Sequence, residues 1–91
     1  MLASEWIDRV KKAHGWTSDY KAAQELEITR GSMSEIRNGH TLTLREDTAI
    51  KVAKALGAPP EAVVLDQYAE RTKAPEIREA LRAAAHRLYI M

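Results

Sequence analysis

The chain contains no cysteine and no phenylalanine, and its 91 residues include only 4 glycines and 3 prolines. The missing cysteine excludes disulfides and cysteine–zinc sites, and it is compatible with a reducing cytoplasm. The missing phenylalanine, together with abundant alanine, favours helices that pack closely on small side chains. We therefore expect a cytoplasmic protein whose core is built from small apolar residues.

Strong net charge and long apolar runs are absent as well. The formal net charge is +1, whereas proteins that bind nucleic acid without regard to sequence are normally strongly basic. No apolar run approaches the roughly 20 residues that span a membrane, and the first residues lack the layout of a signal peptide. A chain of 91 residues suffices for one domain and leaves no room for a separate effector-binding or catalytic domain. The charge balance counts against a sequence-blind nucleic-acid binder and leaves a sequence-specific one open.

Apolar residues recur at helical spacing along the chain, and strand signals are almost absent. Capping residues, glycines and prolines mark the boundaries. Ser4 is the expected cap of the first helix, and the expected helices span about residues 5–14, 19–26, 30–37, 45–56, 60–71 and 75–89. Leu42 is the expected apolar anchor of the polar loop at 39–43. We predict an all-α bundle of five to six helices, with one domain over residues 1–72 and an extra C-terminal helix within residues 73–91.

Residues 19–38 predict two short helices with a tight bend between them. Apolar side chains line one face of each helix, and Ile28 lies in the bend, where it can fill the angle between them. Thr29 is a good N-cap, and Asn38 with Gly39 is a good stop because both tolerate left-handed backbone. The outer face of the second helix carries short or hydrogen-bonding side chains: Arg30, Gly31, Ser32, Glu35 and Arg37. A helix with such a face fits the major groove of DNA.

This pattern resembles the helix-turn-helix domain of the lambda-repressor and Cro family of transcriptional regulators, also called XRE-type. The residues that carry the resemblance are Ala23, Ile28, Met33, Ile36, Asn38 and Gly39, and the segments 49–57 and 60–63 resemble the fourth helix and the start of the fifth. Residues 68–79 are similar to an ending found on small repressors of filamentous phages. Glu27 is a departure, because the family often has glycine in the bend. A non-glycine residue at positive φ costs about 1 kcal/mol, so we expect a turn of slightly different shape.

The resemblance implies that the third helix enters the major groove and contacts bases through Arg30, Gly31, Ser32 and Glu35. Arginine pairs bidentately with guanine O6 and N7, which favours Arg30 as the base-reading residue, with a phosphate contact as its alternative role. Glu35 can accept from cytosine N4; its alternative is an ion pair with Arg37, Arg30 or Lys12. Gly31 lets the backbone approach the DNA closely.

Contacts to DNA phosphates are expected from residues around the motif: Thr17, Ser18, Lys21, Thr29, Arg37, Asn38, His40 and Thr41. For Ser18, Thr29, Asn38 and Thr41 the resemblance implies this role. The family often has a phosphate-binding glutamine where this chain has Asp19. An aspartate would repel the phosphate, so we infer that Asp19 caps its own helix and that Thr17, Ser18 or Lys21 binds the phosphate.

The C-terminal segment carries an apolar stripe at helical spacing: Ile77, Leu81, Ala84 and Leu88. The stripe can complete the core of its own domain, or it can pair with a second copy in a homodimer. Proteins with this motif commonly bind palindromes as dimers. Since no second domain is available, dimerisation has to use this domain or its C-terminal segment, and we favour the fifth and sixth helices.

Together these features predict a homodimeric, sequence-specific DNA-binding regulator in the bacterial cytoplasm, a repressor of phage or mobile-element genes acting on an inverted-repeat operator. One alternative is an antitoxin or antirepressor that uses the same helices to hold a partner protein. Another is a helical adaptor without DNA contact. We expect no enzymatic activity, cofactor, metal site, membrane partner or small-molecule ligand, since no nucleophile–base pair, glycine-rich phosphate loop or set of converging ligands stands out.

Overall fold

The computed structural model describes residues 1–90, and within them the structure is all-helical. It contains α1 (Ala3–His14), α2 (Asp19–Glu25), α3 (Arg30–Arg37), α4 (Glu46–Leu56), α5 (Pro60–Arg71) and α6 (Pro75–Ile90). The predicted all-α class is confirmed. α1 begins at Ala3 with Leu2 as its N-cap, so the expected cap at Ser4 was wrong, whereas the other helix boundaries lie within one residue of their predicted positions. Met91, the last residue of the predicted segment 73–91, lies outside the described residues.

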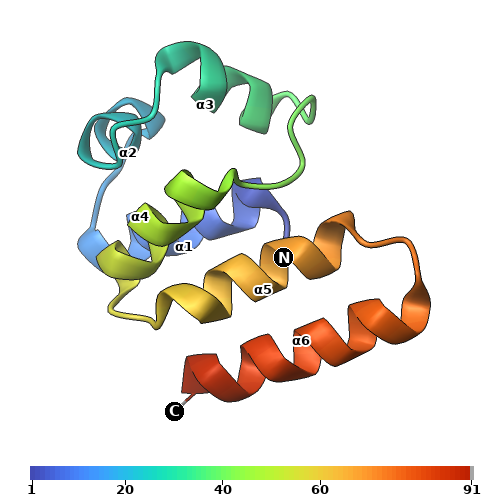
Figure 1. The fold of residues 1–91 in the computed structure, drawn as a ribbon. Helices are drawn as coiled ribbons and strands as arrows, with labels where there is room; N and C mark the ends of the chain where they lie inside the picture. Colours follow the sequence, from blue (N-terminus) through green and yellow to red (C-terminus); the bar gives the residue numbers. More distant parts are fainter. Residues whose placement is uncertain (91) are drawn as a thin grey trace.

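The helices are arranged so that the two short ones lie at one end of the molecule and the two C-terminal ones at the other. α5 and α6 run antiparallel and side by side, α4 packs on α5, and α1 packs on α4 (Figure 1). α2 and α3 contact each other and α1. As a result α3 lies across the molecule from α6 (Figure 1).

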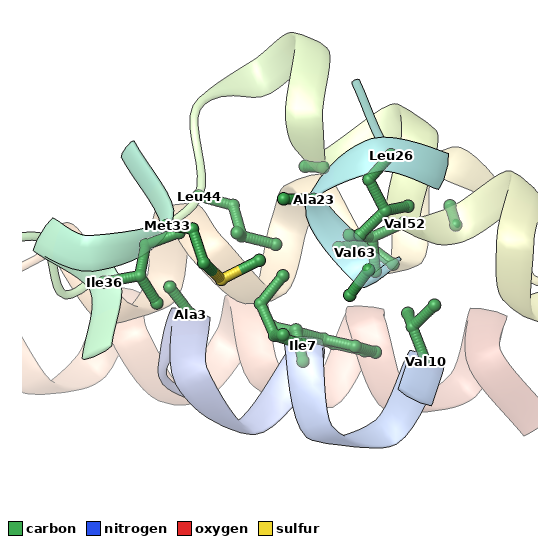
Figure 2. Packing of buried hydrophobic residues seen from close by; sticks show 14 residues of the cluster. Ala3, Ile7, Val10, Ala23, Leu26, Met33, Ile36, Leu44, Val52 and Val63 are labelled. Atoms are coloured by element: carbon green, nitrogen blue, oxygen red, sulfur yellow. The ribbon is translucent and has the colours of Figure 1, made fainter. Parts of the chain in front are cut away.

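The core gathers mostly small and medium-sized side chains from helices α1 to α5 and the α3–α4 connection, together with the ring of Trp6 (Figure 2). Ile7 and Val10 of α1 and Val52 of α4 are fully buried, and Val63 of α5 reaches the same cluster. Alanines at the helix contacts, among them Ala22 and Ala23, allow close approach, in line with the absence of phenylalanine. Burial of a single Val or Ile side chain contributes about 1.5–3 kcal/mol, so this cluster is the main source of stability.

The connection from α3 to α4 is anchored by a different leucine from the one we expected. Leu42 is exposed, whereas Leu44 is 1% exposed and lies in the core. Leu44 is held in addition by its backbone N–H, which donates to Oε1 of the buried Gln67 over 2.6 Å. The Nε2 of Gln67 donates to the backbone carbonyl of Met1 over 2.7 Å, so one buried amide joins this connection, α5 and the N-terminus. The expectation for Leu42 was therefore wrong.

Candidate nucleic-acid interface

α3 is attached to the core by two side chains. Met33 and Ile36 are 5% and 6% exposed, and both belong to the core cluster (Figure 2). Thr29 is the N-cap, as predicted: its hydroxyl oxygen accepts from the backbone N–H of Ser32 over 3.1 Å. The same hydroxyl donates to Oγ of Ser32 over 2.9 Å. The start of α3 is thereby fixed.

The bend between α2 and α3 contains a non-glycine residue in the left-handed region. Glu27 has φ of 54°, so the backbone takes the conformation that glycine eases, despite the side chain. Next to it, the backbone N–H of Ile28 donates to the carbonyl of Ala23 over 2.8 Å, which closes the turn. The strain costs about 1 kcal/mol, and the packing of Met33 and Ile36 has to offset it.

All predicted base-contacting residues lie exposed on the outer face of α3. Arg30, Gly31, Ser32 and Glu35 point away from the side that buries Met33 and Ile36. Space beside Gly31 is open, because a Cβ built there meets no atom within 4 Å beyond its chain neighbours and the backbone of its own helix. Ser34 belongs to the same face and was missed by the sequence reasoning. Helical spacing could have found it, since Ser34 lies three residues after Gly31.

Arg37 and Asp19 form an ion-pair network that joins α1, α2 and α3. Nε of Arg37 donates to Oδ2 of Asp19 over 2.8 Å, and Nη2 donates to Oδ1 of Asp8 over 2.7 Å and to Oδ1 of Asp19 over 2.8 Å. Lys11 adds a further bond to Asp19 over 2.9 Å. Hydrogen bonds from Arg37, aided by Lys11, lower the pKa of Asp19 to about 2. The hydrogen bonds that Arg37 donates to Asp19, and next those to Asp8, raise the pKa of Arg37 above its ordinary value.

This network corrects the role inferred for Asp19. The N-cap of α2 is Ser18, whose Oγ accepts from the backbone N–H of Lys21 over 3.1 Å. Asp19 uses its carboxylate for Lys11 and Arg37 instead, because both cations lie beside it in the folded chain. Among the described contacts Nη1 of Arg37 makes no hydrogen bond, so the predicted phosphate contact of Arg37 has one side of the guanidinium open to it.

Glu35 contacts the loop after α3 rather than a cation. Its Oε2 accepts from the hydroxyl of Thr41 over 3.3 Å, and its backbone carbonyl accepts from the N–H groups of His40 and Thr41. Among residues 1–90 no ion pair to Glu35 is present, so the alternative role of Glu35, a pairing with Arg37, Arg30 or Lys12, is not observed. Asn38 and His40 are exposed, and Thr41 is half-buried. The loop is therefore closed onto the end of α3, with polar side chains facing outward.

The start of α2 carries the remaining residues predicted to contact phosphates. Thr17, Ser18 and Lys21 are exposed, and Lys21 pairs with Glu25 over 2.9 Å. Both side chains of this pair are about half exposed, so the pair is weak and the ammonium can exchange partners.

A groove between α3 and the start of α4 adds residues that the sequence reasoning did not select. It is lined on the α3 side by Ser32 and Glu35 and on the α4 side by Arg45, Thr48 and Lys51. Acidic side chains stand in the same groove, among them Glu27 and Asp47. The potential of this face is therefore mixed, and any affinity for phosphates has to come from a few placed cations and hydrogen-bond donors.

The C-terminal stripe is only partly covered by its own chain. Ile77 is 56% exposed, whereas Leu81, Ala84 and Leu88 are half-buried on the helix that packs along α5. The end of α6 reaches α1: the ring of Tyr89 lies 6.1 Å from that of Trp6, measured between centroids, and the guanidinium of Arg9 lies 5.5 Å from each ring. α6 thus completes the domain along most of its length and leaves its first turn uncovered.

Within the described part of the chain no group of three or more His, Cys, Asp or Glu side chains could hold a metal ion. No helix in residues 1–90 is long and apolar enough to cross a membrane. No protein-family model, curated protein or solved structure matches the chain.

Proposed function

We propose that this protein is a sequence-specific DNA-binding regulator of the lambda-repressor type, in which α3 enters the major groove. The observation that carries the proposal is the outer face of α3, which is exposed and polar while Met33 and Ile36 hold the helix on the core. A groove about 12 Å wide accepts a helix with such a face. A capped start and a closed bend give α3 the fixed orientation that base reading requires.

Base recognition falls to the side chains of that face. Arg30 donates to guanine O6 and N7, and Glu35 accepts from cytosine N4. Ser32 and Ser34 exchange hydrogen bonds with base edges, and Gly31 lets the backbone come close. No cation pairs with Glu35 among the described contacts, and its carboxylate accepts a hydrogen bond from the hydroxyl of Thr41.

Phosphate contacts come from exposed residues before and after the α2–α3 unit. Thr17, Ser18 and Lys21 lie at the start of α2, and Asn38 and His40 lie in the loop after α3. Phosphate contacts from both segments would fix the register and orientation of α3 in the groove. Additional cations, Arg45 and Lys51, line the groove toward α4 and extend the phosphate-binding surface.

The two-fold symmetry of an inverted-repeat operator restricts where two copies can meet. Two α3 helices have to enter successive major grooves on one face of the DNA, about 34 Å apart. Because α6 lies across the molecule from α3 (Figure 1), pairing through the outward face of α6 would direct the two α3 helices away from each other. The second copy therefore docks at an edge near α3 rather than along α6.

One edge of the molecule near the end of α3 carries exposed apolar side chains. Leu42, Tyr68 and Ile77 belong to the α3–α4 connection, the end of α5 and the start of α6. These segments adjoin, because Arg71 donates to the hydroxyl of Thr43 over 3.1 Å and Arg78 donates to the carbonyl of Ala69 over 3.2 Å. A homodimer through this edge uses the fifth and sixth helices and keeps both copies of α3 on one side.

In this role the dimer occupies an operator in the bacterial cytoplasm and represses phage or mobile-element genes by blocking polymerase. The experiment that tests DNA binding is selection of binding sites from random duplex DNA, with the wild type, Arg30→Ala and the control Arg87→Ala, which removes an exposed arginine from α6. We expect a palindromic consensus whose half-site centres lie about 10 base pairs apart or at a multiple of one turn. Arg30→Ala should cost about 1–3 kcal/mol and relax the preference at one position in each half-site, and Arg87→Ala should not.

Failure of the wild type to enrich any sequence would refute the proposal. Capture of a partner protein on the α3 face by a chain that enriches no DNA would instead support the antitoxin or antirepressor function.

A further inference from the structure

Tyr20 has no role in the fold or in the interface described so far. It is the second residue of α2, it is 61% exposed, and its hydroxyl makes no hydrogen bond among the described residues. Its ring lies beside α3, where the guanidinium carbon of Arg30 is 6.0 Å from the ring centroid. Both side chains border a hollow between α2 and α3 that has Ala23 and Met33 in its wall.

The two arginines on this side of α3 are held in different ways. Arg37 is bound by the carboxylates of Asp8 and Asp19, which occupy its Nε and Nη2 donors. Arg30 makes no ion pair with any described residue, and its described contact is the face of the Tyr20 ring. A carboxylate would consume N–H donors and neutralise the charge. An aromatic face instead attracts the guanidinium while all five N–H donors stay available.

We propose that Tyr20 is a positioning residue that holds the Arg30 guanidinium ready to bind a guanine edge, so that the sequence preference of α3 depends on a ring supplied by α2. This inference rests on the proposed DNA-binding function. An arginine without such a support has to be ordered at the moment of binding, at an entropic cost. Tyr20 removes part of that cost in advance and favours one direction of the side chain.

The experiment compares Tyr20→Ala, Tyr20→Phe and the control Gln24→Ala, an exposed residue of the same helix. Each variant is made in the wild-type and Arg30→Ala backgrounds. Affinities are measured for the selected operator and for duplexes in which single guanines are replaced. We expect Tyr20→Ala to reduce discrimination about 2–5-fold at the position that Arg30→Ala relaxes. Tyr20→Phe and Gln24→Ala should leave it unchanged, and Tyr20→Ala should have no further effect once Arg30 is absent.

A DNA-independent measurement accompanies these titrations. In the free protein the Hδ protons of Arg30 should show an upfield ring-current shift by NMR, which Tyr20→Phe retains and Tyr20→Ala loses. The positioning role would be wrong if Tyr20→Ala weakened binding equally on all duplexes, or if Tyr20→Phe lost as much discrimination as Tyr20→Ala. Either result would indicate that the Tyr20 hydroxyl contacts a phosphate. If the wild type binds DNA and Arg30→Ala relaxes one position while Tyr20→Ala changes nothing, only this inference fails. If the wild type binds no DNA, the proposed function fails and the role of Tyr20 fails with it, whatever the ring-current shift shows.

Discussion

Replacing Asp19 with asparagine removes the centre of the network that ties α3 to α1 and α2. The change keeps the size of the side chain and deletes its charge, leaving Arg37 with Asp8 as its remaining carboxylate partner and Lys11 with none among the described residues. We expect a folded but less stable protein, since Ser18 still caps α2 and Met33 and Ile36 still pack on the core.

The size of the effect follows from the pKa of Asp19, which falls from 3.8 to about 2 in the folded chain. A lowering of this size corresponds to roughly 2.4 kcal/mol of interaction with the charged form. The side chain is 37% exposed, so screening by solvent reduces the net contribution to about 1 kcal/mol. For a domain of this length, 1 kcal/mol shifts the melting temperature by about 4–8 °C.

The pH dependence provides the sharper measurement. A carboxyl group with a lowered folded-state pKa contributes stability that is fully present above its unfolded pKa of 3.8 and is lost as the pH falls through about 2. Urea denaturation of the wild type and Asp19→Asn should therefore differ by a constant amount between about pH 5 and 7 and converge toward pH 2. Glu79→Gln, an exposed carboxyl on α6 without an ion pair in the described part of the chain, is the control and should show no such difference. A difference that persists unchanged at pH 2, or no difference at pH 7, would refute the reasoning.

The remaining predictions concern the bend and the dimer edge. Glu27→Gly relieves the strain of φ at 54° and should raise the free energy of unfolding by about 0.5–1 kcal/mol; a lower value in urea denaturation would show that the left-handed backbone carries no net strain. Ile77→Glu should give a folded monomer by analytical ultracentrifugation and weaker operator binding in DNA titrations, because the side chain is 56% exposed in a single copy and a charge there would disrupt the contact between two copies. Leu81→Glu, by contrast, should lower the melting temperature, because Leu81 is half-buried within its own chain.

The mixed charge of the proposed interface affects how strongly it would bind DNA and how that binding would depend on salt. Acidic side chains such as Glu27 and Asp47 lie among the cations of the groove, and Arg37 is paired with two carboxylates. Few phosphates can therefore be neutralised by one copy, so we expect weak binding to arbitrary DNA and a shallow salt dependence. Useful affinity then depends on base contacts and on the linkage of two half-sites, which increases the importance of the dimer edge.

Features determined by local interactions were accessible from the sequence alone. The cap at Thr29 forms a hydrogen bond three residues along the chain, and the glycine at position 57, which follows α4, takes the left-handed φ of 68° that ends a helix. The helical stripe of Met33 and Ile36 depends only on the period of the helix, and both residues are buried as that period predicts. Such features involve neighbours on the same or the next turn, so residue type and spacing suffice to predict them.

Only the tertiary structure decided which partners meet across elements. Arg37 binds Asp8 and Asp19, which are 29 and 18 residues away, and Gln67 binds the backbone of Leu44, 23 residues away. Leu44 rather than Leu42 is the anchor because its backbone bonds to Gln67 and because α5 lies against it. Neither contact produces a periodic pattern in the sequence that could have predicted it. Contacts of this kind depend on how whole helices pack. Several residues of suitable chemistry compete for each partner in the sequence, and the packing of the core selects among them.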